Sequence, residues 1–303
     1  MFISRTSRWR TLAASGALLS LILAACAGGG SPAPATGSPG PTVAPTSTPT
    51  TAPPSTEPIA VLLQVTSEGG FINPSSQLAA LPTVVVYSDG RVLTRAASPT
   101  SNPDPLLPRV SIRDLGPTGA AAILAAIQAA ALDKPSTEDP GISADSGVTV
   151  FAVTSGGSVT TTRYAASGGG PGLPGGGGGG PGKTAAFDLL NRLLDTTDAW
   201  GGTAPAETVY QPLGYRVFAA AAAADPSAPA PVAWPLTESL ADIGTPTVPD
   251  RGVAGLRSGV VLGADAATLG PVLDAAAAGT TFTSSGTTFT VWVRPLLPHE
   301  LPG

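Results

Sequence analysis

The chain has 303 residues, with 38 glycines, 33 prolines, one cysteine and one histidine, and a formal net charge of −5. An acidic chain lacks the positive charge that draws proteins to nucleic acid or to anionic lipid. A single cysteine excludes a disulfide framework and a zinc site built on thiolates. We therefore expect no nucleic acid, metal or cofactor among its ligands.

The first 25 residues have the pattern of a secretory signal peptide. Residues 1–10 carry three arginines and no acid, and residues 11–25 form an uncharged, mostly apolar run before Cys26. A positive segment, a short apolar segment and small residues at the cut define such a signal. The run is too short and its flanks too one-sided for a comfortable membrane span. The ending Leu-Ala-Ala-Cys at 23–26 resembles the bacterial lipobox, in which the cysteine is acylated. We therefore predict lipidation of Cys26 and a lipid-anchored position on the outer side of the cell membrane.

Two low-complexity segments divide the rest of the chain. Residues 26–58 are dominated by Pro, Ser, Thr, Ala and Gly, with one charged residue, and too little apolar surface to offset the entropy of ordering. We expect this part to be a disordered stalk that holds the folded body away from the membrane. Residues 167–182 are almost all glycine and proline and are interpreted as a flexible insert. Folded segments are predicted at 59–199, which includes the insert, and at 200–303.

The first folded segment alternates strand and helix signals. Asp-Gly and Gly-Gly between β-branched runs predict two hairpins. An alanine-rich stretch opened by Pro117 and an amphipathic stretch after the insert predict two helices. The expected strands are 59–66, 83–87, 91–94, 109–113, 148–154 and 159–164, and the expected helices are 117–132 and 183–194.

The second folded segment has the same kinds of signal. We expect strands at 210–219 and 256–262, a short helix at 238–243, a helix at 265–277 and a closing hairpin with strands 281–283 and 287–293. Leu115-Gly116 and Leu262-Gly263 each end a strand and open a helix that a hairpin follows, which suggests two related halves. The predicted fold class is α+β, with a mixed or antiparallel sheet and packed helices.

One nucleotide-binding pattern is present but is rejected. Residues 177–184 match the P-loop pattern and precede a helix. A P-loop needs a buried strand that delivers its glycines to the helix N-terminus, and here some fifteen Gly and Pro residues come before the lysine. We expect no nucleotide ligand.

Three residues are candidates for ligand binding. Glu68 lies beside paired glycines at the end of the first strand, and its alternatives are a turn contact or simple solvation. A pair of carboxylates for glycoside chemistry needs a second acid about 5–10 Å away, and Asp145, Asp89 and Asp114 qualify only by residue type. Trp234 is expected to be a packing residue, or else part of an exposed aromatic surface.

The sequence lacks the residue patterns of a calcium loop and of a Ser/His/Asp triad. The region around Asp139 and Asp145 does not have the ligand spacing of a calcium loop. No Gly-x-Ser-x-Gly motif occurs, and the only histidine, His299, lies in a proline-rich C-terminal segment, so a Ser/His/Asp triad has no evident base. The sequence leans away from an enzyme.

Several separated motifs resemble a family of uncharacterised membrane-anchored lipoproteins of high-GC, actinobacteria-like bacteria. The resemblance rests on short segments in a common order: 66–71 (TSEGGF), 85–92 (VVYSDGRV), 144–149 (ADSGVT), 164–165 (YA), 234–236 (WPL) and 294–300 (RPLLPHE). It implies a lipid-anchored location and this architecture, and it assigns no activity to any residue.

These features together favour a binding or envelope-associated module held at the membrane by lipid on Cys26. Its expected partner is a cell-wall component or a neighbouring envelope protein. Two alternatives are a carboxylate-dependent hydrolase of wall polymers, with Glu68 and Asp145 as its acids, and a lipoprotein that captures a solute.

Overall fold

The computed structural model describes residues 59–69, 77–96, 104–136, 147–165, 180–223, 229–247 and 252–302. These residues belong to one compact unit, Ser55–Gly303. The predicted signal peptide, Cys26 and the whole predicted stalk lie outside the described residues, as does most of the Gly/Pro insert.

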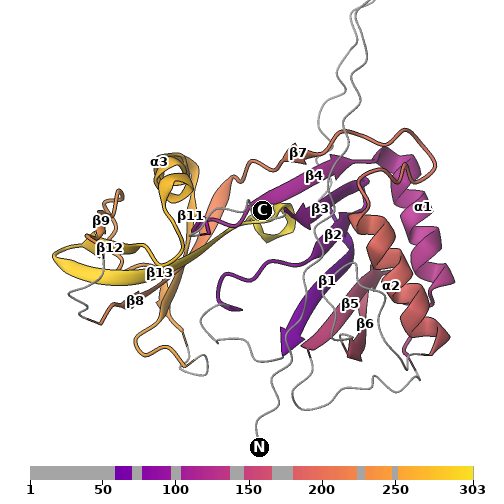
Figure 1. Ribbon diagram of the computed structural model, residues 1–303, viewed down its shortest axis with the longest axis horizontal. Helices are drawn as coiled ribbons and strands as arrows, with labels where there is room; N and C mark the ends of the chain where they lie inside the picture. Colours follow the sequence, from indigo (N-terminus) through magenta and orange to yellow (C-terminus); the bar gives the residue numbers. More distant parts are fainter. Residues whose placement is uncertain are drawn as a thin grey trace, which may run out of the picture. The chain divides into compact units, whose positions relative to one another are not determined.

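Seven strands form an antiparallel sheet in the order β6-β5-β1-β2-β3-β4-β7 (Figure 1). They are β1 (Val61–Gly69), β2 (Val84–Tyr87), β3 (Arg91–Arg95), β4 (Val110–Asp114), β5 (Gly147–Ser155), β6 (Ser158–Ala165) and β7 (Thr208–Val209). The two predicted hairpins, β2–β3 and β5–β6, are confirmed. Gly90 has a φ of +93°, and Gly156 and Gly157 have φ of +57° and +79°, which are backbone conformations that glycine adopts at low cost.

Two helices cover one face of this sheet, α1 (Gly116–Ala129) and α2 (Pro181–Leu194). The predicted apolar positions Ile123, Ile127 and Leu193 are fully buried in the core beneath them. That core also contains Leu63 and Val65 of β1, which alternate with Gln64 and Thr66 on the opposite face. On that opposite face, Gln64 and Thr66 line a small pocket.

Six strands form a second, mixed sheet in the order β10-β11-β8-β13-β12-β9. They are β8 (Gly214–Ala221), β9 (Val232–Ala233), β10 (Thr245–Pro246), β11 (Arg257–Leu262), β12 (Thr281–Ser284) and β13 (Thr287–Pro295). Helix α3 (Gly263–Ala275) packs on it through Ala266, Leu269 and Leu273. The α+β class with antiparallel and mixed sheets is therefore confirmed.

Several predicted elements differ from the structure. Residues 238–243 form turns rather than a helix, because tertiary partners satisfy their polar groups: Ser284 Oγ accepts from the Leu240 N–H at 3.1 Å, and the Glu238 carbonyl accepts from Trp234 Nε1 at 3.1 Å. The strand predicted from 210 begins at Gly214. Pro181 and Gly182, assigned to the flexible insert, form the first turn of α2, where proline is favoured.

The order strand, helix, hairpin occurs twice, as β4-α1-β5-β6 and as β11-α3-β12-β13. The pairing differs between the two. The first strand of the β5–β6 hairpin pairs with the inner strand β1, whereas the second strand of the β12–β13 hairpin pairs with the inner strand β8. Common descent of the two halves stays a hypothesis that would have to account for this difference.

The C-terminal segment connects the two sheets. After β13 leaves the second sheet, Leu297 enters an apolar cluster on the open face of the first sheet with Val85, Tyr87 and Leu93. The Tyr210 hydroxyl donates to the Leu296 carbonyl at 2.9 Å. A 3-10 turn, Pro298–Glu300, follows and brings the only histidine of the chain to the first sheet.

Candidate functional site

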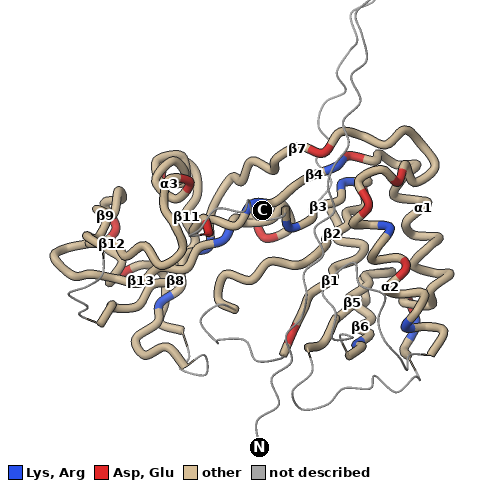
Figure 2. Tube along the Cα trace, viewed as in Figure 1, with Lys and Arg blue, Asp and Glu red and all other residues tan. Residues whose placement is uncertain are grey.

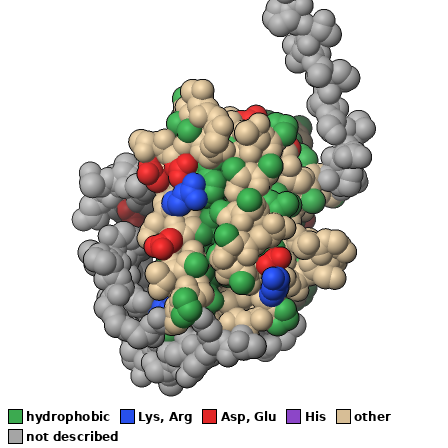
Figure 3. Space-filling view, turned by 90° about the vertical axis from the view of Figure 1, so that its right-hand side faces the viewer, with side chains coloured by type: hydrophobic (Ala, Val, Ile, Leu, Met, Phe, Trp, Pro, Cys, Tyr) green, Lys and Arg blue, Asp and Glu red, His purple; other side chains and the backbone are tan. Residues whose placement is uncertain are grey.

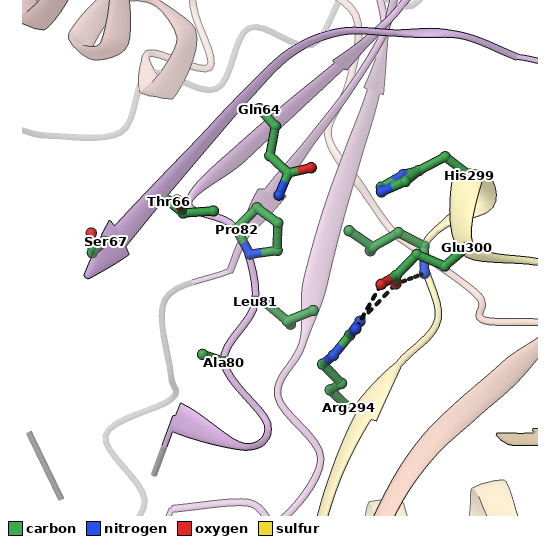
Figure 4. A pocket seen from close by; sticks show the side chains of 10 residues that line it. Gln64, Thr66, Ser67, Ala80, Leu81, Pro82, Arg294, His299 and Glu300 are labelled. Carbon is green, nitrogen blue, oxygen red and sulfur yellow. Dashed lines mark hydrogen bonds and ion pairs between the residues drawn. The ribbon is translucent and has the colours of Figure 1, made fainter. Parts of the chain in front are cut away.

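A small polar pocket lies where this C-terminal segment meets β1 (Figure 4). Its volume is about 160 Å³. β1 contributes Gln64, Thr66 and Ser67, the segment after residue 79 contributes apolar walls, and the C-terminal segment contributes Arg294, Leu297, His299 and Glu300. Pockets for drug-sized ligands span roughly 300–1,000 Å³, so this one fits a small polar group.

The two charged groups of the pocket are paired with each other. Arg294 donates to both carboxylate oxygens of Glu300, at 2.6 Å each, and the Leu297 N–H donates to Glu300 Oε2 at 2.9 Å. The side chains are only 13% and 20% exposed. Burial alone would raise the pKa of Glu300, but the hydrogen bonds from Arg294 and Leu297 outweigh it and hold the pKa below its usual value. The pair is therefore ionised at neutral pH.

His299 is held by a tyrosine from the first sheet. Tyr87 Oη and His299 Nδ1 are 2.8 Å apart, and the two rings lie 5.7 Å apart between their centroids. Burial raises the pKa of Tyr87 and lowers the pKa of His299, which leaves both groups uncharged at neutral pH. We assign the tyrosine hydroxyl as the donor to Nδ1, so the ring proton is on Nε2.

The remaining pocket groups are neutral donors and acceptors. In Figure 4 the Gln64 amide and the His299 imidazole point toward each other from opposite sides of the pocket. An amide supplies two N–H groups and one carbonyl, and a neutral imidazole with a protonated Nε2 supplies one further donor. With Arg294 and Glu300 already neutralising each other, the arrangement suits an uncharged polar group such as an amide or a hydroxyl.

Glu68 lies on β1 next to this pocket but does not line it. Its carboxylate pairs with Arg163 of β6 at 3.3 Å, and the two side chains are 48% and 54% exposed. Such exposed pairs contribute little to stability. Asp145, the acid named with it for a hydrolase, lies outside the described residues, as does Asp139.

Trp234 is a packing residue. It is 8% exposed, its ring meets Phe282 edge-on at 5.7 Å between centroids, and its Nε1 donates to the Glu238 carbonyl at 3.1 Å. Both ends of the indole are thus occupied within the core of the second sheet.

The other acids considered from the sequence have local roles. Asp89 pairs with Arg91 at 2.7 Å in the β2–β3 hairpin, and Asp114 Oδ1 accepts from the Gly116 N–H at 3.0 Å where α1 begins. Within the described ranges, no three His, Cys, Asp or Glu side chains gather as a metal site would require. Of the P-loop pattern, Lys183 lies in the first turn of α2, and most of the glycines lie outside those ranges.

Charged side chains are sparse and scattered over the described surface. Acidic and basic residues are interspersed along the chain in Figure 2, and α1 contains none at all. The face in Figure 3, on the side where α1 and α2 lie in Figure 1, shows apolar side chains with few charges. Among the described helices, none is long and apolar enough to cross a membrane.

Sequence reasoning missed Gln64 and Tyr87 and set His299 aside as a tail residue. Gln64 interrupts an apolar strand, which was a usable sign that its face carries something other than core. Tyr87 and His299 are 212 positions apart, and no local pattern connects them.

Comparison with protein-family models, with curated proteins and with solved structures finds no match for this chain.

Proposed function

We propose that the chain is an extracytoplasmic lipoprotein, anchored by acylated Cys26, whose body is a binding module for a cell-wall component or a neighbouring envelope protein. The observation that carries the binding role is the polar pocket in which Gln64 and His299 converge beside a self-neutralised Arg294–Glu300 pair. The anchor rests on the signal-peptide pattern of residues 1–25 and on the resemblance of residues 23–26 to the bacterial lipobox.

The pocket favours a neutral ligand group. A free carboxylate or phosphate would find no unpaired positive charge in the pocket. Arg294 is already neutralised by Glu300, and burial lowers the pKa of His299, so its imidazole is uncharged. An amide or hydroxyl exchanges hydrogen bonds with Gln64 and His299 without burying a net charge. Peptide groups and N-acetylated sugars both carry such amides, which agrees with a wall or protein partner.

The anchor is tested by comparing the full-length chain with Cys26→Ala and, as a matched control, Ser31→Ala. In the wild type, mass spectrometry of the N-terminal peptide should show an added mass on Cys26 that corresponds to acyl chains. The wild-type protein should also enter the detergent phase in phase partitioning. Ser31→Ala should behave like wild type, and Cys26→Ala should lose both properties. Wild-type protein with an unmodified Cys26 would remove the anchor from the proposal.

Binding is tested by pull-down of the full-length chain from crosslinked cells. Wild type is compared with Gln64→Ala, which empties one wall of the pocket, and with Gln128→Ala, which removes an exposed glutamine of α1 far from it in sequence. Loss of one good hydrogen bond should lower recovery of the partner several-fold, by roughly tenfold at most. Recovery that is equal for Gln64→Ala and Gln128→Ala would move binding away from this pocket.

The hydrolase alternative gains no support from the described residues. The exposed Glu68 side chain is paired with Arg163, and the one carboxylate among the residues that line the pocket, Glu300, has its pKa lowered rather than raised. A general acid needs a raised pKa. The pocket is also small for a polymer-cleaving or solute-capturing site.

A further inference from the structure

The two described sheets have four edges, and three of them are closed in the same way. The outer strands β7, β9 and β10 are each two residues long, and β10 contains Pro246. Very short edge strands and proline prevent another chain from adding to a sheet. The fourth edge, β6, is different: it is eight residues long, and its register with β5 runs unbroken from Ser158 to Ala165. In Figure 1, β6 lies outside β5 at the end of the first sheet.

The register shows which backbone groups of β6 face outward. Ser155 and Ser158 flank the two-residue Gly156-Gly157 turn and form the closing hydrogen-bonded pair of the hairpin. Hydrogen-bonded and non-hydrogen-bonded pairs then alternate along the ladder, so Val159, Thr161 and Arg163 direct their N–H and C=O groups away from β5. All three residues are exposed, Val159 to 64%.

The composition of β6 also favours pairing. It reads Ser-Val-Thr-Thr-Thr-Arg-Tyr-Ala, with four β-branched residues, no proline and a single charge. Arg163 is already paired with Glu68 two strands away. The strand has none of the devices that protect the other three edges.

Among the described residues, no strand pairs with the outer side of β6. The gaps between the described residues are short and each contains proline or glycine: 70–76, 97–103, 137–146, 166–179, 224–228 and 248–251. The stretch before residue 59 is rich in proline, which lacks the N–H that a ladder requires. These compositions disfavour a strand from the rest of the chain, so a second chain is the better source of a strand for this edge.

We propose that β6 pairs with β6 of a second copy of this chain, antiparallel about a twofold axis at Thr161. In this register Thr161 of one copy faces Thr161 of the other, and Val159 faces Arg163 of the other copy. The two Arg163 side chains, the only charges of the strands, therefore do not face each other. The axis makes one continuous sheet of both seven-stranded sheets, an isologous contact in which each copy uses the same surface. The contact is narrow, so the dimer is weak in dilute solution and is favoured where copies are concentrated.

The test is disulfide trapping in the full-length chain, in which Cys26 is the only natural cysteine. Paired residues across the axis have Cα atoms about 5.5 Å apart, within the range that a disulfide spans, so Thr161→Cys should be trapped as a dimer on mild oxidation. Val159→Cys is the matched control on the same edge. Its two copies lie about four residues apart along the strands, roughly 13 Å, which no disulfide bridges.

The expected result is roughly tenfold more disulfide dimer for Thr161→Cys than for Val159→Cys or wild type, because only a thiol at position 161 meets its counterpart within bonding distance. Wild type reports any linkage through Cys26. Both substitutions are at exposed positions, and circular dichroism melts that match wild type show that the variants are folded. A monomeric Thr161→Cys, or equal trapping at both positions, would overturn the proposal. A disulfide between the Thr161→Cys variant and a protein of different mass would also overturn the proposal, because β6 would then pair with a different protein.

Discussion

The Arg294–Glu300 pair is expected to be a main support of the C-terminal segment, and Glu300→Gln tests this directly. The substitution keeps the size of the side chain but leaves a guanidinium, only 13% exposed, without its counter-ion, and weakens the bond from the Leu297 N–H. Breaking charge-assisted hydrogen bonds costs about 1.5–3 kcal/mol, and loss of one partner of a well-buried pair costs more. Because this pair is partly solvated, we expect a loss of about 2 kcal/mol in the free energy of unfolding.

For a folded unit of this size, that loss lowers Tm by roughly 4–8 °C. Differential scanning calorimetry of wild type and Glu300→Gln measures it at pH 7. The matched control is Glu68→Gln, which breaks an ion pair whose side chains are 48% and 54% exposed and should cost less than about 0.5 kcal/mol. Removing the orphaned charge as well, with Arg294→Met in the Glu300→Gln chain, should recover part of the loss.

The effect also has a predicted pH dependence. The pKa of Glu300 is lower in the folded state than its usual value of 4.5, so the stabilisation is complete above that pH and is lost as the pH falls through the folded-state pKa. Wild type and Glu300→Gln should therefore differ at neutral pH and converge in acid. Equal Tm values for Glu300→Gln and Glu68→Gln at pH 7 would refute the reasoning.

Three further predictions concern the same body. Burial lowers the pKa of His299, so wild-type stability should decline as the pH falls below 6.5, and His299→Asn should flatten that slope in melts between about pH 5 and 7.5. Tyr87→Phe should cost about 1 kcal/mol and, by removing the donor to Nδ1, should raise the pKa of the single histidine in an NMR titration. Gly90→Ala should cost about 2–4 kcal/mol in urea unfolding, since its Cβ would overlap the Gly116 backbone, whereas Gly156→Ala, at a positive φ in open space, should cost about 1 kcal/mol.

Most of the secondary structure could be predicted because its signals are local. Asp89-Gly90 and Gly156-Gly157 specify tight turns between β-branched runs, and both hairpins form there. Ile123 and Ile127 mark the buried face of α1 by their helical spacing. In each case the residues that carry the signal are within a few positions of the structure they determine.

The failures occur where distant contacts decide the backbone. β7 is two residues long and exists because Val209 pairs with Ser111 of β4, almost a hundred positions earlier. Leu240 and Ile243 have the spacing of a helix, but they belong to turns and their side chains are buried. The backbone of these turns is hydrogen-bonded to Ser284 and Trp234. No window of sequence around these residues contains all of their partners.

The pocket is unpredictable for the same reason, and its construction also suggests how to find its ligand. Gln64 belongs to the first sheet, while His299 and Glu300 follow the last strand of the second. A ligand that bonds to both Gln64 and His299 therefore adds a connection between two parts that already meet through Leu297 and Tyr210 and through residues such as Leu78 and Leu107. Such a ligand stabilises only the folded state, by about 2.7 kcal/mol at one hundred times its Kd, and for a unit of this size that raises Tm by roughly 5–10 °C. Small amides and N-acetyl sugars can thus be ranked by their effect on Tm, and a true ligand should lose its effect in Gln64→Ala while keeping it in Gln128→Ala.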